Sequence, residues 1–288
     1  MRRRVLTPMI LLLALALVAA CAAPVQPGGE EAAPAEAGEA VEQVLRIATG
    51  SSGEASFHFN ALVAGSDHQN WSTLQFIPPM YFDVDNNLKP GVFSAWEGNE
   101  DGTEWTFTID PAAMWSDGTP VTAQQVVDSW QIQSAPINNV GRVRGYLGNV
   151  EGFEEAREAA ADEMIVEVSG LQALDDSTVN VKLVKPDPAF HWRIATAHLA
   201  PNRADKVLEL GWNEFWKPEN APIVSGPYVL TAFDPDLQTA EMGPNENWWM
   251  DEGPYLDRIT FQFVPDAQVI GAMVLNDEID VSLAPIPP

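Results

Sequence analysis

Cysteine is almost absent from this sequence, since Cys21 is the only one among 288 residues. Disulfide frameworks, thiolate zinc sites and iron–sulfur clusters each need two or more sulfur atoms, so the sequence excludes them. Histidine is also scarce, and no two of the four have the i, i+4 spacing that places two imidazoles on one helix face for zinc. We therefore predict no metal site and no cofactor.

Basic residues are few as well. Fifteen Lys and Arg stand against 41 Asp and Glu, which gives a formal net charge of −26 at pH 7. A surface of this charge repels phosphate backbones and anionic headgroups. We therefore predict that the protein has no nucleic-acid partner.

The apolar run at residues 9–20 is too short to span a bilayer as a helix. It follows Arg2–Arg4 and ends in small residues before a cysteine, an arrangement typical of an export signal. The string Val18-Ala19-Ala20-Cys21 resembles the lipobox of bacterial lipoprotein precursors, in which the cysteine becomes the lipidated first residue. We predict a signal peptide over 1–21 and lipidation of Cys21; the alternative is an ordinary secretory signal cut nearby.

Removal of the leader's arginines leaves 12 basic against 41 acidic residues, a formal charge of −29. A polybasic patch cannot hold such a chain at a membrane, so acyl chains on Cys21 would supply the affinity. Residues 22–43 are nearly all Ala, Pro, Gly and Glu, too poor in large apolar groups to order themselves. We predict a flexible linker there and a folded domain over 44–288.

Strands and helices are predicted in alternation along 44–288. Alternating apolar and polar residues indicate strands, whereas amphipathic or Ala-rich segments indicate helices. The predicted strands are 44–48, 105–109, 178–183 and 259–263, with a hairpin of 228–233 and 237–242 around a turn at 234–236. The predicted helices are 123–134, capped by a Thr122–Gln125 capping box, 153–164, 203–210 and 267–276. This order favours an α/β body with a mixed sheet and peripheral helices.

Catalytic motifs are missing from the sequence: it contains no Gly-x-Ser-x-Gly, no Gly-x-x-x-x-Gly-Lys and no Gly-x-Gly-x-x-Gly. Residues 83–87 begin like a calcium loop, but Leu88 and Ser94 replace the glycine and glutamate that such a loop needs, so we predict a solvated turn. Abundant carboxylates and ten tryptophans leave one enzyme class open, an exported carbohydrate-active enzyme with paired carboxylates. The spacing of several tryptophans also fits structural packing: Trp96, Trp105, Trp115 and Trp130.

Three separated strings in the folded domain carry a family resemblance. The first comprises Leu88-Lys89-Pro90-Gly91-Val92, Trp105-Thr106-Phe107-Thr108-Ile109 and Trp115-Ser116-Asp117-Gly118-Thr119-Pro120-Val121-Thr122-Ala123. The second runs from Gly211-Trp212 through Lys217-Pro218-Glu219-Asn220 to Ser225-Gly226-Pro227-Tyr228-Val229-Leu230. The third comprises Asn245-Glu246-Asn247-Trp248-Trp249, Tyr255-Leu256-Asp257-Arg258-Ile259-Thr260-Phe261 and Glu278-Ile279-Asp280. In order and spacing, the chain resembles the family 5 solute-binding proteins of ABC importers, the oligopeptide, dipeptide and nickel-binding group.

The chain departs from the family pattern at three points. Asp110-Pro111-Ala112-Ala113 replaces an Arg-x-Gly turn, Gln125 replaces an acidic residue, and Asp277 stands where glycine usually precedes Glu-Ile-Asp. These departures indicate a divergent member. The strings themselves are turns, a capped helix and core aromatics, so we interpret them as scaffold and not as ligand contacts.

The resemblance implies a fold and an architecture. The expected fold is the first lobe of a periplasmic-binding-protein-like (type II) α/β protein, with the second lobe missing from this chain. Family members have about twice this length, and a two-lobed binder encloses its ligand by hinge closure. We therefore expect the chain alone to bind its ligand weakly or not at all.

The resemblance also implies a function. The expected protein is an exported, lipid-anchored receptor on the outer face of the cytoplasmic membrane. It would capture a short peptide or similar small solute, perform no chemistry, act as a monomer and deliver the solute to an ABC permease. A nickel complex, haem or an oligosaccharide remains open as the ligand within the same fold.

Family analogy places the loop after the first strand and the segment before Pro78 at the ligand. The candidate contacts there are Ser51, Ser52, Phe57, His58 and Trp71. For each of them, a loop or packing role is the competing interpretation.

Overall fold

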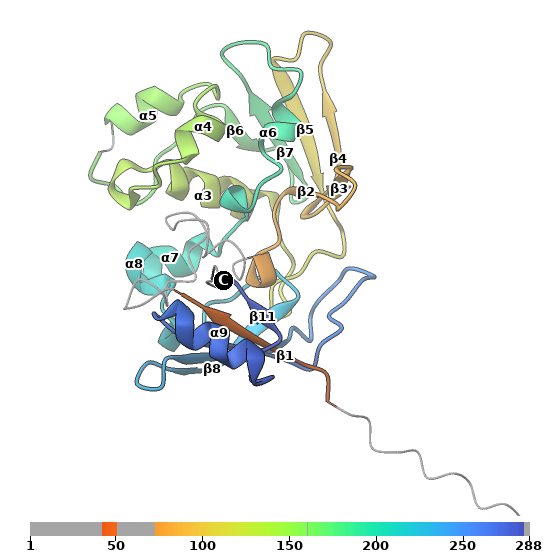
Figure 1. Ribbon diagram of the computed structural model, residues 1–288. Coiled ribbons are helices and arrows are strands. Elements are labelled where there is room, and N and C mark those ends of the chain that lie inside the picture. The colour runs from red at the N-terminus through yellow and green to blue at the C-terminus, as the bar shows by residue number, and fades with distance from the viewer. Residues whose placement is uncertain (1–41, 51–72, 160, 285–288) are drawn as a thin grey trace, which may run out of the picture. The chain divides into compact units, whose positions relative to one another are not determined.

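The computed structural model describes residues 42–50, 73–159 and 161–284. The predicted leader, with Cys21, and residues 22–41 of the predicted linker lie outside these residues. Within them, strands and short helices alternate, and the strands form a five-stranded, a four-stranded and a two-stranded sheet (Figure 1). The α/β class predicted from the sequence is confirmed.

The five-stranded sheet joins the two ends of the described chain. Its strands are β1 (Val44–Thr49), β8 (Tyr228–Asp234), β9 (Thr239–Pro244), β10 (Arg258–Phe263) and β11 (Val281–Ser282), in the order β11-β1-β10-β9-β8. β1 pairs in parallel with both β10 and β11, whereas the β10–β9 and β9–β8 pairs are antiparallel. The sheet is therefore mixed, as predicted.

Period-two alternation in these strands produces two different faces. Ile259, Phe261 and Phe263 are buried in a cluster with Ile47 from β1. The opposite face is partly covered by α9 (Ala267–Leu275), which is capped by Asp266, whose side chain accepts a hydrogen bond from the N–H of Gln268. Figure 1 shows α9 beside β1 and β11. The buried side chains Ile270 and Met273 of α9 form a cluster with Ala48, Val264 and Ile279.

The four-stranded sheet is antiparallel and holds the largest core. It consists of β4 (Phe93–Gly98), β5 (Glu104–Ile109), β6 (Leu171–Ala173) and β7 (Thr178–Lys182), in the order β4-β5-β7-β6. The Phe93 and Phe107 rings stack at 5.0 Å, and Trp130 meets Phe93 edge-on at 6.0 Å. Trp115 and Trp130 are fully buried, and Trp105 nearly so, which confirms their interpretation as packing residues.

A two-stranded hairpin adjoins this sheet, formed by β2 (Met80–Phe82) and β3 (Leu88–Pro90). The carboxylate of Asp83 in its turn accepts hydrogen bonds from the backbone N–H groups of Asp85 and Asn87 and from the Asn87 side chain. These local donors, with Lys89 at 3.3 Å, occupy the carboxylate. The interpretation of residues 83–87 as a solvated turn is confirmed.

The helix α3 (Ala123–Ser134) has the predicted bounds and the predicted capping box. Gln125 N–H donates to the Thr122 hydroxyl, and Thr122 N–H donates to the Gln125 side chain. The remaining helical segments are α4 (Val143–Leu147), α5 (Phe153–Ala159), α6 (Phe190–Arg193), α7 (Ala204–Leu210), α8 (Trp212–Phe215), η2 (Pro136–Asn138), η3 (Ala197–Leu199) and η4 (Pro218–Asn220).

Two predicted elements have boundaries that differ from the structure by two residues or more. The helix expected over 153–164 is shorter, because only Phe153 and Ala156 of α5 are buried, and residues 161–162 form a turn that is followed by a bend at residue 164. Ala and Glu favour a helix there, but helices of this length depend on packing that these residues do not provide. The second hairpin strand begins at Thr239 and not at Leu237, because Gln238 adopts a left-handed φ of 56°.

Candidate functional site

The Trp-Ser-Asp-Gly string of residues 115–118 forms a tight turn. Trp115 N–H donates to the Thr119 carbonyl, and Gly118 N–H donates back to Trp115, with Gly118 at a φ of 79° that glycine adopts without strain. The Trp115 indole donates to the Gln125 side chain, which links the turn to α3. This string is structural, as interpreted from the sequence.

Asp117 and Arg203 hold this turn to the start of α7. Arg203 donates to Asp117 at 2.6 Å and to Asp205 at 2.7 Å. Its hydrogen bond to Asp205, with a further one to Asp117, raises the pKa of Arg203 and keeps it charged. Burial alone would raise the pKa of Asp117, but hydrogen bonds from Thr119 and Arg203 outweigh it and lower that pKa.

Ser116 joins all three strings of the resemblance. Its N–H donates to the Val224 carbonyl at 2.7 Å, and its hydroxyl accepts from Val224 N–H at 3.1 Å. The Asn247 amide donates to the Ser116 carbonyl at 3.0 Å. Asn245 in turn donates to the Gly226 carbonyl at 2.8 Å. These contacts form a rigid frame beside the five-stranded sheet.

The frame fixes the short segment 74–77. The Gln75 carbonyl accepts the N–H groups of Ser225 and Gly226, at 3.0 and 2.7 Å, and the Ser225 hydroxyl accepts Ile77 N–H. A Cβ at residue 226 would lie 2.5 Å from the backbone of Leu74 and Gln75, so only glycine fits. This segment begins directly after residues 51–72, the stretch that carries the sequence-predicted ligand contacts.

The carboxyl end of β1 lies just before residues 51–72 in the sequence. The parallel strands β1, β10 and β11 end together there: Val264 N–H donates to Thr49 and Leu283 N–H donates to Ala48, at 2.8 and 2.9 Å. In open α/β sheets, ligands bind outside the carboxyl ends of parallel strands. This edge, together with segment 74–77, is the candidate ligand-binding site.

Two buried polar side chains of the candidate site, one at the strand edge and one in segment 74–77, stand out. The Thr49 hydroxyl and both ends of the Gln75 amide are buried without a hydrogen bond among the described residues. A buried unpaired polar group costs about 1–3 kcal/mol, so such groups favour any ligand or water that supplies partners. Sequence reasoning missed both residues, because neither belongs to a recognisable motif.

The sequence-predicted contacts Ser51, Ser52, Phe57, His58 and Trp71 lie outside the described residues, so they remain predictions. The structure describes the residues on either side of the stretch 51–72, namely Gly50 and Thr73. Gly50 follows the strand edge, and Thr73 precedes segment 74–77.

An ion pair fixes β11 to β1 near this edge. Arg46 donates to both oxygens of the Asp280 carboxylate, at 2.8 and 3.1 Å, and to the Asp277 carbonyl at 2.7 Å. Hydrogen bonds from the Arg46 side chain and backbone lower the pKa of Asp280 to about 2. The Glu-Ile-Asp string therefore positions the short strand that completes the parallel edge.

Histidines and acids show no metal-binding arrangement in the described part of the chain, where no group of three or more His, Cys, Asp or Glu residues could hold an ion. The His191 and Trp105 rings pack in a tilted arrangement with their centres 4.7 Å apart, and burial lowers the pKa of His191, so it is a neutral packing residue at pH 7. Among residues 42–50, 73–159 and 161–284, no helix is long and apolar enough to cross a membrane.

Solved structures share this fold. The structure of Haemophilus influenzae OppA in complex with RPPGFSPFR superposes with a TM-score of 0.74 at 24% identity, over 86% of this chain and 47% of that one. The structure of the Escherichia coli murein tripeptide binding protein MppA superposes with a TM-score of 0.72 at 26% identity, over 84% of this chain and 46% of that one. The periplasmic-binding-protein-like fold is thereby established, and the chain spans less than half of either structure.

Sequence comparison gives the same result. The periplasmic oligopeptide-binding protein OppA of Escherichia coli is 33% identical over 170 residues, which cover 58% of this chain and 30% of that protein. Residues 87–288 match the family described as bacterial extracellular solute-binding proteins, family 5. The chain therefore belongs to the family 5 bacterial extracellular solute-binding proteins, as its sequence strings predicted.

Proposed function

We propose that this chain is the first lobe of a receptor that captures short peptides and delivers them to an ABC permease in the cytoplasmic membrane. The observation that carries the proposal is the family match over residues 87–288, on a fold shared with peptide-binding relatives. The receptor performs no chemistry. It acts as a monomer whose ligand is enclosed between two lobes.

The candidate site supports capture of an extended peptide. The carboxyl edge of β1, β10 and β11, with the buried Thr49 hydroxyl and Gln75 amide, offers hydrogen-bonding groups. Extended pairing reads the main chain of a peptide and tolerates varied side chains. Ser51, Ser52, Phe57, His58 and Trp71 belong to the stretch that joins the two parts of this edge, and we propose them as contacts.

Export and anchoring complete the proposal. Residues 1–21 act as a lipoprotein signal peptide, Cys21 carries the acyl chains, and residues 22–43 hold the folded domain away from the outer face of the membrane. Labelling with a fatty-acid analogue in the native host tests this step. The wild-type protein should be labelled and membrane-bound, while the Cys21→Ser variant should be unlabelled and released; labelled Cys21→Ser protein would contradict the anchor.

The ligand class is tested on the receptor isolated from the host membrane. An immunoblot with an antibody against residues 44–288 first gives its mass, expected at roughly twice the 31.4 kDa of this chain. Calorimetry then compares short peptides with a nickel complex, haem and oligosaccharides. Saturable binding of peptides alone supports the proposal. Binding of another class, or turnover of polysaccharide as the carbohydrate-active alternative requires, would overturn it.

A further inference from the structure

A pocket of about 460 Å³ lies between α4, the segment that follows β7, and α6. Pockets that hold small molecules commonly have about 300–1,000 Å³. Three cationic side chains line this one, Arg144 from α4, Lys185 from the segment after β7 and Arg193 at the end of α6. We call it the basic pocket. Its elements are separate from the strand edge proposed for the peptide.

The backbone around Lys185 is held by Asn149. The Asn149 amide donates to the Lys185 carbonyl at 2.8 Å, and its oxygen accepts Lys185 N–H at 3.2 Å. Val184 N–H also donates to the Asn149 carbonyl at 2.8 Å. The wall of the basic pocket is therefore built from defined contacts, and the exposed Lys185 side chain extends from a fixed position.

The charges of the basic pocket are not balanced by its own acids. Asp187 is the one carboxylate in its lining, and Arg193 already donates to it at 2.8 and 3.0 Å. Arg144 is paired with Glu154, while Lys185 has no carboxylate within 4 Å among the described residues. Most other described basic side chains do have one, namely Arg46, Lys89, Arg203, Lys206, Lys217 and Arg258.

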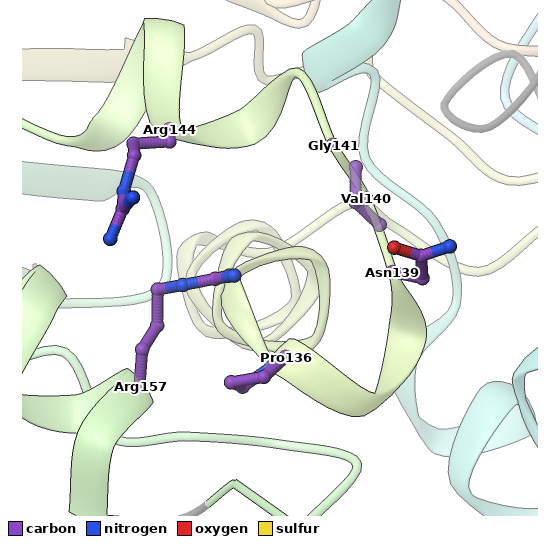
Figure 2. A pocket seen from close by; sticks show the side chains of 6 residues that line it. All are labelled: Pro136, Asn139, Val140, Gly141, Arg144 and Arg157. Carbon is purple, nitrogen blue, oxygen red and sulfur yellow. The ribbon is translucent and has the colours of Figure 1, made fainter.

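A second, smaller pocket of about 130 Å³ shares Arg144 with the basic pocket and adds Arg157. Figure 2 shows the two arginines extending from opposite walls toward the space between them. Arg157 donates to the Ser134 carbonyl and lies 5.5 Å from the centre of the Phe153 ring, with no carboxylate paired to it among the described residues. The two pockets together are lined by four basic side chains, of which Arg144 and Arg193 are paired with Glu154 and Asp187.

We propose that the basic pocket binds a small oxyanion, a molecule with carboxylate or phosphate groups, independently of the peptide site. Guanidinium groups match the geometry of carboxylate and phosphate oxygens, and an ammonium adds a mobile point charge. The net charge of the protein would repel such an anion elsewhere on the surface. Local attraction at Lys185, Arg144 and Arg193 therefore makes the binding selective for this place.

Calorimetry on the full 288-residue chain, at constant ionic strength, tests the proposal with citrate and inorganic phosphate as probes. We expect saturable binding of at least one probe, and the preferred probe shows whether the pocket takes polycarboxylates or phosphates. Lys185→Gln and Arg144→Gln should each weaken binding at least tenfold. Lys206→Gln, which removes a cation paired with Glu209 outside the pocket, should leave the affinity unchanged.

Three results would overturn the proposal. One is the absence of saturable binding by either probe. Another is a loss of anion affinity in Lys206→Gln as large as that in Lys185→Gln, which would mean that the overall charge of the protein governs the binding. The last is wild-type affinity in a Lys185→Gln, Arg144→Gln double variant that melts at the wild-type temperature by circular dichroism. None of these results depends on peptide binding, so this proposal and the proposed function can fail separately.

Discussion

At the scale of single residues, Asp277 adopts a left-handed backbone conformation that favours glycine. Its φ is 56°, in the turn between α9 and β11, where the Cβ of any residue except glycine is crowded. This is also the position at which the family resemblance expects glycine. Arg46 contacts the backbone carbonyl of Asp277, a bond that does not depend on its side chain.

We predict that Asp277→Gly stabilises the folded domain by up to about 1 kcal/mol, because it relieves a left-handed conformation. Urea unfolding followed by circular dichroism measures the change. The neighbouring Asn276→Gly is the matched control, since Asn276 has an ordinary φ of −96° and should lose stability from the added chain entropy. Changes of the same sign in both variants would contradict the explanation.

The Arg46–Asp280 pair makes stability depend on pH. Because the pKa of Asp280 is lowered to about 2 by hydrogen bonds from Arg46, its contribution is fully present above the ordinary value of 3.8. This contribution is lost as pH falls from about 3.8 through about 2. Asp280→Asn should therefore be less stable than wild type at pH 7, and the difference should shrink near pH 2.

Urea unfolding of wild type and Asp280→Asn at several pH values between 7 and 2 checks this prediction. Asp236→Asn, an exposed change in the hairpin turn, serves as a control for the loss of one negative charge. A stability difference that stays constant across the whole range would show that the ion pair does not contribute in the predicted way.

At the scale of elements, the segment 74–77 depends on a backbone approach that only glycine permits. Gly226→Ala would place a methyl group 2.5 Å from the backbone of Leu74 and Gln75. Backbone atoms cannot move away by changing a rotamer, as the end of a flexible side chain can. We predict a loss of about 1–3 kcal/mol in unfolding free energy, the usual cost of overpacking.

Gly141→Ala is the matched control for that substitution. A Cβ at Gly141 meets nothing within 4 Å, so its effect should stay within about 0.5 kcal/mol. Differential scanning calorimetry on both variants gives the comparison. Equal losses in the two variants would mean that the close approach at Gly226 carries no special cost.

At the scale of the whole molecule, the chain spans less than half of the solved relatives that it matches. In a two-lobed receptor, contacts from the second lobe provide much of the affinity. We predict that the 288-residue chain binds short peptides weakly or not at all. Calorimetry with the same peptides used on the isolated receptor measures this, and micromolar or tighter binding by the chain alone would contradict it.

Local features were predictable because their causes act over a few residues. The α3 capping box joins Thr122 to Gln125, and the alternation of Ile259, Phe261 and Phe263 reflects one strand with one buried face. The helix predicted over 153–164 was too long because its end depends on contacts that are not local. Helical propensity is local, but burial, which ends α5 at Ala159, depends on the rest of the fold.

The α/β class, the family and most of the longer strands and helices could be predicted from the sequence, since periodicity, caps and turn residues are properties of neighbouring positions. The candidate site could be found only in the tertiary structure. Ser116 contacts Val224 and Asn247, 108 and 131 positions away, and Thr49 and Gln75 become buried, with no hydrogen-bond partner for their side chains in the described part of the chain, only when distant segments pack around them. Such contacts leave no local pattern, because packing between remote segments, and not the order of neighbouring residues, brings them together.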